Sequence, residues 1–240
     1  MISRTRSFTV LGGIGLAAGL LTLLGLAGVG SQHEASPPEA VAEPVTGGDP
    51  RMATQPELRQ VLLTADDLPA GFRPSPVPAR PAVAATPVTE CQTLFERLSA
   101  LAAPATGAAV SHTGRTPGSS LRQAVTIYPA QLAAEAVGAL RAATSRCSRF
   151  PASLDDGTAV TVEMAPYAQI LPRDSFTVRL SVAGPRGTMS GYLAVGRVGQ
   201  VVSVLRDLGP VGTVPAQEVT ALLDRALDKL VPVGTQVVSR

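Results

Sequence analysis

The stretch SFTVRLSVAGPRGTMSGYLAVGRVGQVVSVL, residues 175–205, decides the fold. Apolar and polar residues alternate over 175–183, which predicts a half-buried β-strand whose inward side carries Phe176, Val178, Leu180 and Val182. The sequence GPRG at 184–187 predicts a tight turn into a second strand over 188–195. A turn around 196–199 then leads to a third strand over 198–205. Because strands joined by such short turns pair antiparallel, we expect an antiparallel sheet at the centre of the domain.

The rest of the chain adds helices and two further strands to this sheet. Alternation predicts strands over 121–128 and 158–164. Loops are expected at 69–87, which holds six prolines, and at 105–120, which is rich in Gly, Ser and Thr. Apolar residues at helical spacing predict a short turn and three helices, over 57–63, 90–103, 131–146 and 215–231.

These elements follow the order α-β-α-β-β-β-β-α, which is typical of the α+β class. We therefore expect a twisted antiparallel sheet of about 4–5 strands, with the helices packed mainly on one face.

The N-terminus carries an export or anchoring signal. Arg4 and Arg6 precede an uncharged apolar run over 8–30, which is long for a signal peptide and long enough to span a bilayer. The run is therefore either cleaved near its end or retained as a single-span anchor, and its length favours the anchor. Residues 31–55, rich in Pro, Ala and Glu, predict a flexible tether, and 56–240 form an extracytoplasmic domain. Val29 follows LAG where a lipidated cysteine would stand, so lipidation is not expected there.

Composition and motifs exclude several function classes. The chain has 20 basic and 18 acidic residues and only 3% aromatic residues, without a basic stripe, so nucleic acid is not an expected partner. The sequence contains no G-x-S-x-G elbow, no HExxH and no phosphate loop, and we expect neither an enzyme nor a cofactor. Ser111 and His112 are adjacent in a predicted loop, where a solvated histidine is the simpler interpretation.

Two cysteines, Cys91 and Cys147, are present, each near the end of a predicted helix. In an exported domain, the simplest expectation for two cysteines is that they form one disulfide. The loop-entropy relation gives a stabilisation of about 4 kcal/mol for this bond. The alternatives are free thiols or a metal pair. Because neither His33 nor His112 has a neighbour at ligand spacing, no metal site is expected.

The stretch LLTADDLPAGF, residues 62–72, holds two adjacent carboxylates. Thr64 and Asp67 fit the spacing of a capping box, and Asp66 and Asp67 lie where a helical turn has its positive end. The sequence therefore predicts a structural cap and not a catalytic pair.

The polar face of the strands is either a solvated face, which is the simpler interpretation, or the floor of a ligand site. Arg179 could hold an anionic group, with Tyr128 and Tyr192 beside it and Glu163 nearby. The alternative is a solvated face on which Glu163 and Arg179 pair across strands.

Several segments resemble an actinobacterial family of exported sensor-domain proteins, similar to the extracellular sensor domain of PknH-type receptor kinases. The resemblance spans roughly residues 56–232, and its segments are LLTADDLPAGF (62–72), Cys91, AVTIYP (124–129), Cys147, DSFTVRL (174–180), GYLAVGRVGQVVSVL (191–205) and the last helix. It implies a twisted antiparallel sheet backed by helices, with a cleft for an unidentified ligand. The chain departs from the kinases in lacking a kinase domain and in having one possible disulfide where they carry two.

These observations favour a non-catalytic, extracytoplasmic sensor-like protein of the cell envelope that binds an unknown small molecule. A carrier of lipids or other apolar molecules, or a module that binds another envelope protein, is the alternative. The membrane is a partner if the N-terminal segment is uncleaved.

Overall fold

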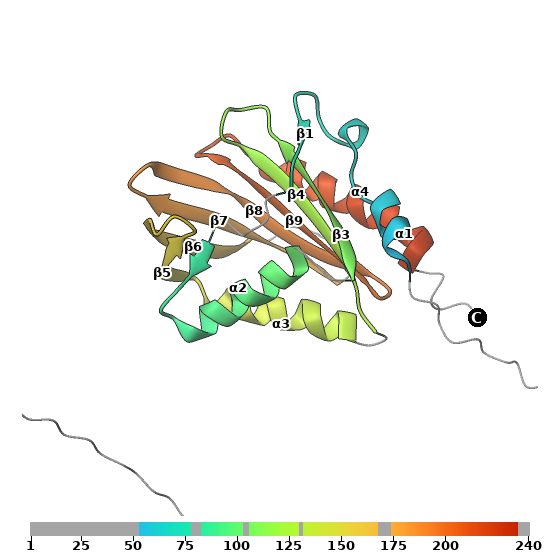
Figure 1. Ribbon diagram of the computed structural model, residues 1–240, viewed down its shortest axis with the longest axis horizontal. Helices are drawn as coiled ribbons and strands as arrows, with labels where there is room; N and C mark the ends of the chain where they lie inside the picture. The colour runs from blue at the N-terminus through green and yellow to red at the C-terminus, as the bar shows by residue number, and fades with distance from the viewer. Residues whose placement is uncertain (1–52, 78–82, 103–105, 130–131, 168–173, 235–240) are drawn as a thin grey trace, which may run out of the picture. The chain divides into compact units, whose positions relative to one another are not determined.

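The computed structural model describes residues 53–77, 83–102, 106–129, 132–167 and 174–234 (Figure 1). These residues all belong to one compact unit, Thr46–Arg240. The predicted export segment and nearly all of the predicted tether lie outside the described residues. Within the described residues, no helix is long and apolar enough to cross a membrane.

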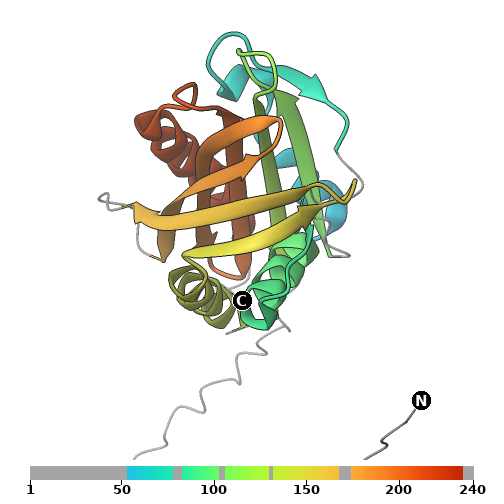
Figure 2. The same cartoon turned by 90° about the vertical axis from the view of Figure 1, so that its left-hand side faces the viewer.

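Nine strands form one antiparallel sheet in the order β1-β3-β4-β9-β8-β7-β6-β5-β2. Figure 2 shows β5 and β6 crossing β8 and β9 steeply, which is the twist expected of a large sheet. The strands are β1 (Arg73–Ser75), β2 (Val83–Ala85), β3 (Gly107–Thr113), β4 (Ser120–Ile127), β5 (Arg149–Leu154), β6 (Ala159–Tyr167), β7 (Ser175–Gly184), β8 (Gly187–Val198) and β9 (Val201–Pro210).

The three predicted strands of the opening stretch are present as β7, β8 and β9, joined by tight turns. Gly187 and Gly199 lie at these turns with positive φ angles of 115° and 56°, a conformation that favours glycine. The predicted α+β class is confirmed, but the sheet is larger than the predicted 4–5 strands.

Four strands, β1, β2, β3 and β5, fall outside the predicted ones. The segment of β3, GAAVSHT, consists mostly of small and polar residues with low strand propensity, yet it pairs with β4 over its whole length. Pro74 in β1 and Pro151 in β5 disguise two of the other segments, since proline usually argues against a strand. Pairing with a neighbouring strand of the sheet overrides these local preferences.

The helices cover both faces of the sheet, which corrects the expectation of one covered face. Figure 1 shows α2 and α3 on one side and α4 on the other. In β8, Leu193 and Val195 enter the core beneath α2 and α3, whereas Tyr192 and Ala194 enter the core beneath α1 and α4. The helices are α1 (Gln55–Gln60), α2 (Thr89–Ala102), α3 (Leu132–Arg146) and α4 (Ala216–Gly234).

We call these two sides of the sheet the α3 face and the α4 face. The central strands read as nearly continuous apolar runs, such as VVSVL at 201–205, because they are buried on both faces. The stripe of Val219, Leu222, Leu223, Ala226, Leu227 and Leu230 on α4 is buried on the α4 face, at the spacing expected of an amphipathic helix.

The predicted cap residues lie around a short 3₁₀ helix, η1 (Ala65–Asp67). The backbone N–H and the hydroxyl of Thr64 both donate to Oδ2 of Asp67, at 2.8 and 2.9 Å. Asp66 lies on the exposed side of the turn. Asp67 does more than close the turn, because Lys229 Nζ of α4 contacts the same Oδ2 at 2.5 Å and Arg225 donates to its carbonyl oxygen. Burial alone would raise the pKa of Asp67, but its bonds to Lys229 and Thr64 hold that pKa below its usual value.

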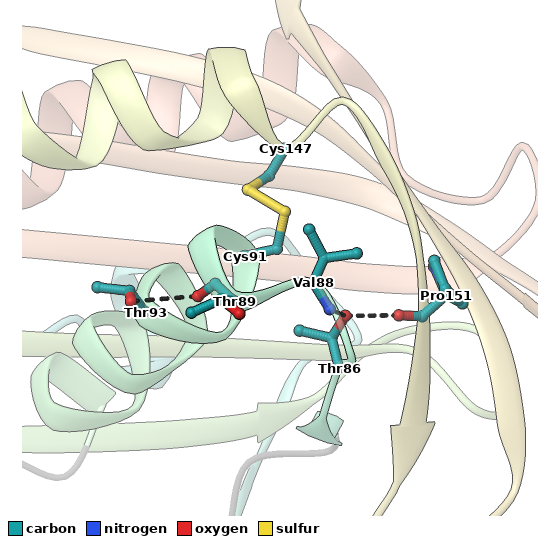
Figure 3. Close-up of a disulfide and its surroundings, with 7 residues drawn as sticks. All are labelled: Thr86, Val88, Thr89, Cys91, Thr93, Cys147 and Pro151. Atoms are coloured by element: carbon teal, nitrogen blue, oxygen red, sulfur yellow. Dashed lines mark hydrogen bonds between the residues drawn. A yellow bond between two sulfur atoms is a disulfide. The ribbon is translucent and has the colours of Figure 1, made fainter. Parts of the chain in front are cut away.

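The predicted disulfide joins Cys91, in the first turn of α2, to Cys147, which follows α3 (Figure 3). The two Cα atoms are 5.6 Å apart and both residues are buried in the α3-face core. Next to it, the Thr86 hydroxyl donates to the carbonyl oxygen of Pro151 and accepts from the N–H of Val88. The bridge and these bonds fix the start of α2 against the edge of the sheet.

Substituting Asp67→Asn is expected to lower the free energy of unfolding by about 1–2 kcal/mol, because it weakens both the cap and the contact with Lys229. Urea denaturation measures the loss. The neighbouring Asp66→Asn substitution is the matched control, and its effect should stay within about 0.5 kcal/mol. Equal losses for the two variants would contradict the anchoring role of Asp67.

Substituting both Cys91 and Cys147 with alanine is expected to lower the free energy of unfolding by about 4 kcal/mol, because the unfolded chain loses its cross-link. Denaturation of the reduced wild-type protein is the control that keeps both sulfur atoms in the core. A loss below about 1 kcal/mol in both samples would show that the bridge is not a main source of stability.

Candidate functional site

The four predicted ligand contacts do not form one cluster, because the sheet divides them between its faces. Tyr128 continues the alternation of β4 on the α3 face, where it packs against the core beneath α2 and α3. Arg179, Tyr192 and Glu163 lie on the α4 face. The apolar residues of β4, Val125 and Ile127, face α4, whereas those of β7 face α3, so polar positions in the two strands point to opposite sides. A ligand-binding role for these four residues stays a prediction.

On the α4 face, Arg179 and Tyr192 are direct neighbours across β7 and β8. Tyr192 is buried at 6% exposure and meets the ring of Tyr167 edge to face, with 5.2 Å between centroids. Glu163 forms an ion pair of 2.8 Å with Arg149 of β5. Its partner across the sheet is therefore Arg149 and not the expected Arg179, and an exposed pair of this kind contributes little stability.

Tyr128, on the other face, is half-buried. Burial raises the pKa of its hydroxyl, and the charge of Arg97 on α2 opposes that rise. Its backbone N–H donates to the carbonyl oxygen of Gln200. Tyr128 therefore contributes to the contact between the end of β4 and the turn before β9.

Buried polar residues that sequence reasoning missed gather on the α4 face. Gln123 accepts from the backbone N–H of Leu63 at 2.6 Å and donates to the Ser203 hydroxyl at 3.3 Å. It therefore ties the segment between α1 and η1 to the sheet.

His112, expected in a solvated loop, lies in β3 at 2% exposure because that loop is a strand. Neither ring nitrogen makes a hydrogen bond with a described residue. Burial lowers the pKa of His112, and the nearby backbone of Leu63 offsets only part of that effect. Ser111, the preceding residue in the strand, faces the opposite side, so the two cannot act together.

Asp207 is the buried carboxyl group of the α4 face, at 2% exposure between Leu121 of β4 and Tyr192 of β8. Burial raises its pKa to about 7, the charge of Glu218 adds to the rise, and the charge of Arg115 opposes it. Arg115 forms an ion pair with Glu218 and lies over the ring of Phe72. Asp207 therefore changes charge near neutral pH.

A second polar arrangement crosses the α3 face. Ser75, Ser111, Arg122 and Arg206 are consecutive partners in the register of β1, β3, β4 and β9, and we call them the arginine row. Their side chains share the α3 face with Val204, two residues before Arg206. Sequence reasoning missed the row because the pairing of β4 with β9 joins segments far apart in the chain.

Among the described residues, no group of three or more His, Cys, Asp or Glu side chains is arranged to hold a metal ion.

No protein-family model and no curated protein matches the chain. Among solved structures, the chain is similar to the extracellular domain of PknH from Mycobacterium tuberculosis, with a TM-score of 0.59 and 13% identity over 75% of this chain and 98% of that domain. A putative uncharacterized protein from Mycobacterium smegmatis, described as the Rv0999 ortholog, is matched with a TM-score of 0.33 and 13% identity, over 75% of this chain and 95% of that one. The first match confirms the predicted PknH-like sensor-domain fold.

The stability of the protein is expected to depend on pH through Asp207. Its native pKa of about 7 lies above the usual 3.8, so between these values the native state binds more protons than the unfolded state. Stability from this group therefore falls as the pH rises through that window. The free energy of unfolding of Asp207→Asn, taken relative to that of wild type, should rise by more than about 1 kcal/mol between pH 5 and pH 8. Urea denaturation at each pH measures this difference.

The effect of His112 is common to both proteins and cancels in this difference. Asp155→Asn, which removes an exposed carboxylate from a loop, is the control and should show no such trend. A difference between Asp207→Asn and wild type that is constant over the pH range would contradict the raised pKa.

Proposed function

We propose that this chain is a non-catalytic, extracytoplasmic ligand-binding protein of sensor type, held at the cell envelope by its N-terminal segment or secreted after cleavage. The fold of an extracellular receptor domain, matched over 98% of that domain, supports the proposal. A disulfide that is buried in the core fits an oxidising compartment, where such bonds form and persist.

The observation that carries the proposal is that ionisable side chains are buried on both faces of the sheet. Arg122 is 6% exposed and Asp207 is 2% exposed, and they lie on opposite faces. Burying a charged group costs free energy, and a small sheet protein gains nothing in folding from charges that apolar residues could replace. Such residues are typical of binding sites.

The two alternatives to this proposal would use other kinds of residue. A carrier of apolar molecules would use an apolar lining, whereas the unusual positions here are charged. A protein-interaction module would use exposed residues such as Arg149, Glu163 and Arg179, which lie together on β5, β6 and β7 outside the main contacts of α4. The proposal therefore favours a polar small molecule as the ligand.

Intact mass spectrometry of the protein exported by its native host tests the proposal. Under native conditions, a reproducible small-molecule adduct is expected, and it should disappear after denaturation and refolding in clean buffer. The denatured mass also gives the true N-terminus and therefore shows whether residues 8–30 are retained.

Two outcomes would count against the proposal. An adduct that is wholly apolar would favour the carrier. An adduct-free protein that is purified in a fixed ratio with another envelope protein would favour the interaction module.

A further inference from the structure

His112 is a buried ionisable side chain whose ring nitrogens are left without hydrogen bonds. It lies in β3 at 2% exposure, and neither nitrogen has a hydrogen-bond partner among the described residues. A neutral imidazole leaves one donor and one acceptor unpaired in this position, whereas an imidazolium would leave two donors and a positive charge. Burying the charged form without a partner is much the more costly of the two. The closed structure therefore holds His112 in its neutral form.

The residues next to this ring on the α4 face belong to the short segment between α1 and η1, residues 61–64, which we call the cover segment. Helix α1 packs against β3 (Figure 1), and the cover segment continues from it with Val61, Leu62 and Leu63 buried in the α4-face core. The N–H of Leu63 donates to Oε1 of Gln123 at 2.6 Å, and Gln123 lies diagonally from His112 across β3 and β4. Leu63 is therefore the point at which the cover segment meets the polar side chains of the sheet.

A proton on His112 would have no counter-ion beside it. Its direct neighbours in the sheet are Pro74 of β1 and Leu121 of β4, and Asp207 lies beyond Leu121, two strands away. Burial lowers the pKa of His112, the backbone of Leu63 partly opposes this, and no charged group of the described residues contributes. The only relief for a charged His112 is therefore access to water.

The other charged groups on the elements around His112 are bonded elsewhere, exposed, or on the opposite face. The bonded groups are Glu57 with Thr54, Asp67 with Lys229 and Arg225, and Arg115 with Glu218. The exposed groups are Arg59, Asp66, Asp224 and Asp228. The groups on the α3 face are Arg73 and Arg122.

We propose that His112 is an acid-sensitive switch that couples proton uptake to opening of the cover segment. In the closed state the ring is neutral and shielded from water. When the cover segment opens, water reaches the ring, which then takes up a proton as a free imidazole does. Because the predicted tether leads directly into α1, opening loosens the connection between the tether and the sheet. The switch needs no ligand, so it stands or fails separately from the proposed function.

The direction of the effect follows from proton binding. The pKa of His112 in the closed state lies below the usual 6.5, so at acid pH the open state binds more protons than the closed state. The stability of the closed segment is thus fully present above pH 6.5 and is lost as the pH falls toward the closed-state pKa. Between pH 7.5 and pH 5, the opening equilibrium constant can rise by up to about thirtyfold. Asp67 stays ionised over this range, because its pKa lies below 3.8.

Native-state hydrogen exchange of the full chain at pH 7.5, 6.5 and 5, corrected for the intrinsic exchange rate at each pH, tests the switch. The opening constant of the Leu62 and Leu63 amides should rise severalfold or more as the pH falls. His112→Leu, which keeps an apolar side chain of similar size in the strand, is the matched control and should show no such rise. Amides of β7, which pairs with neither β3 nor β4, should show none either.

Two further measurements keep the test specific. Repeating the comparison in an Asp207→Asn background removes the contribution of that carboxyl group. In a His33→Ala variant, His112 is the one remaining histidine, so the NMR shifts of its ring protons report its own titration. The midpoint of that titration in the closed state should lie below pH 6.5.

Three outcomes would overturn the proposal. The first is a rise in the opening constant of less than about twofold, or an equal rise in His112→Leu. The second is an equal rise in β7, which would mean that acid destabilises the whole fold. The third is a titration midpoint of His112 at or above pH 6.5 while the cover segment stays protected from exchange.

Discussion

The pairing of β4 with β9 is the constraint on which the rest of the structure depends. It joins residues 120–127 to residues 201–208, and without it β1, β3 and β4 would have no partner in the C-terminal half of the sheet. The same pairing places Leu121 and Val125 in the core beneath α4, and it brings Arg122 beside Arg206. Because its partners are so far apart in sequence, the pairing is entropically costly to form and is expected to come late in folding.

Local sequence patterns predicted the parts of the fold that short-range physics determines. The hairpins of β7, β8 and β9 follow from alternation and glycine turns, and α2, α3 and α4 follow from helical spacing. The missed β3 carries Gly, Ala and Ser, so its strand conformation comes from β4 and not from its own residues. The second covered face was also missed, although the continuous apolar run at 201–205 is the signal of a strand buried on both sides.

The candidate site was less predictable than the fold, because it depends on which strands become neighbours. Arg179 and Tyr192 were correctly expected on one face, since both belong to the same hairpin. Alternation places Tyr128 on the polar side of its own strand, but which face of the sheet that side becomes depends on the strand order. Arg122 and Arg206 look like ordinary polar positions in their own strands. Only the register of β4 with β9 shows that the two are direct neighbours.

The two outer strands of the sheet bear on how the protein behaves when crowded. An unpaired strand edge is a template for intermolecular pairing, and long flat edges lead to aggregation. Here the sheet ends in β1 and β2, each three residues long, and β1 carries Pro74, which has no N–H to donate. Each outer strand therefore offers a neighbouring copy only a short ladder to extend. Such a domain can be displayed at high density on a surface while its copies remain separate.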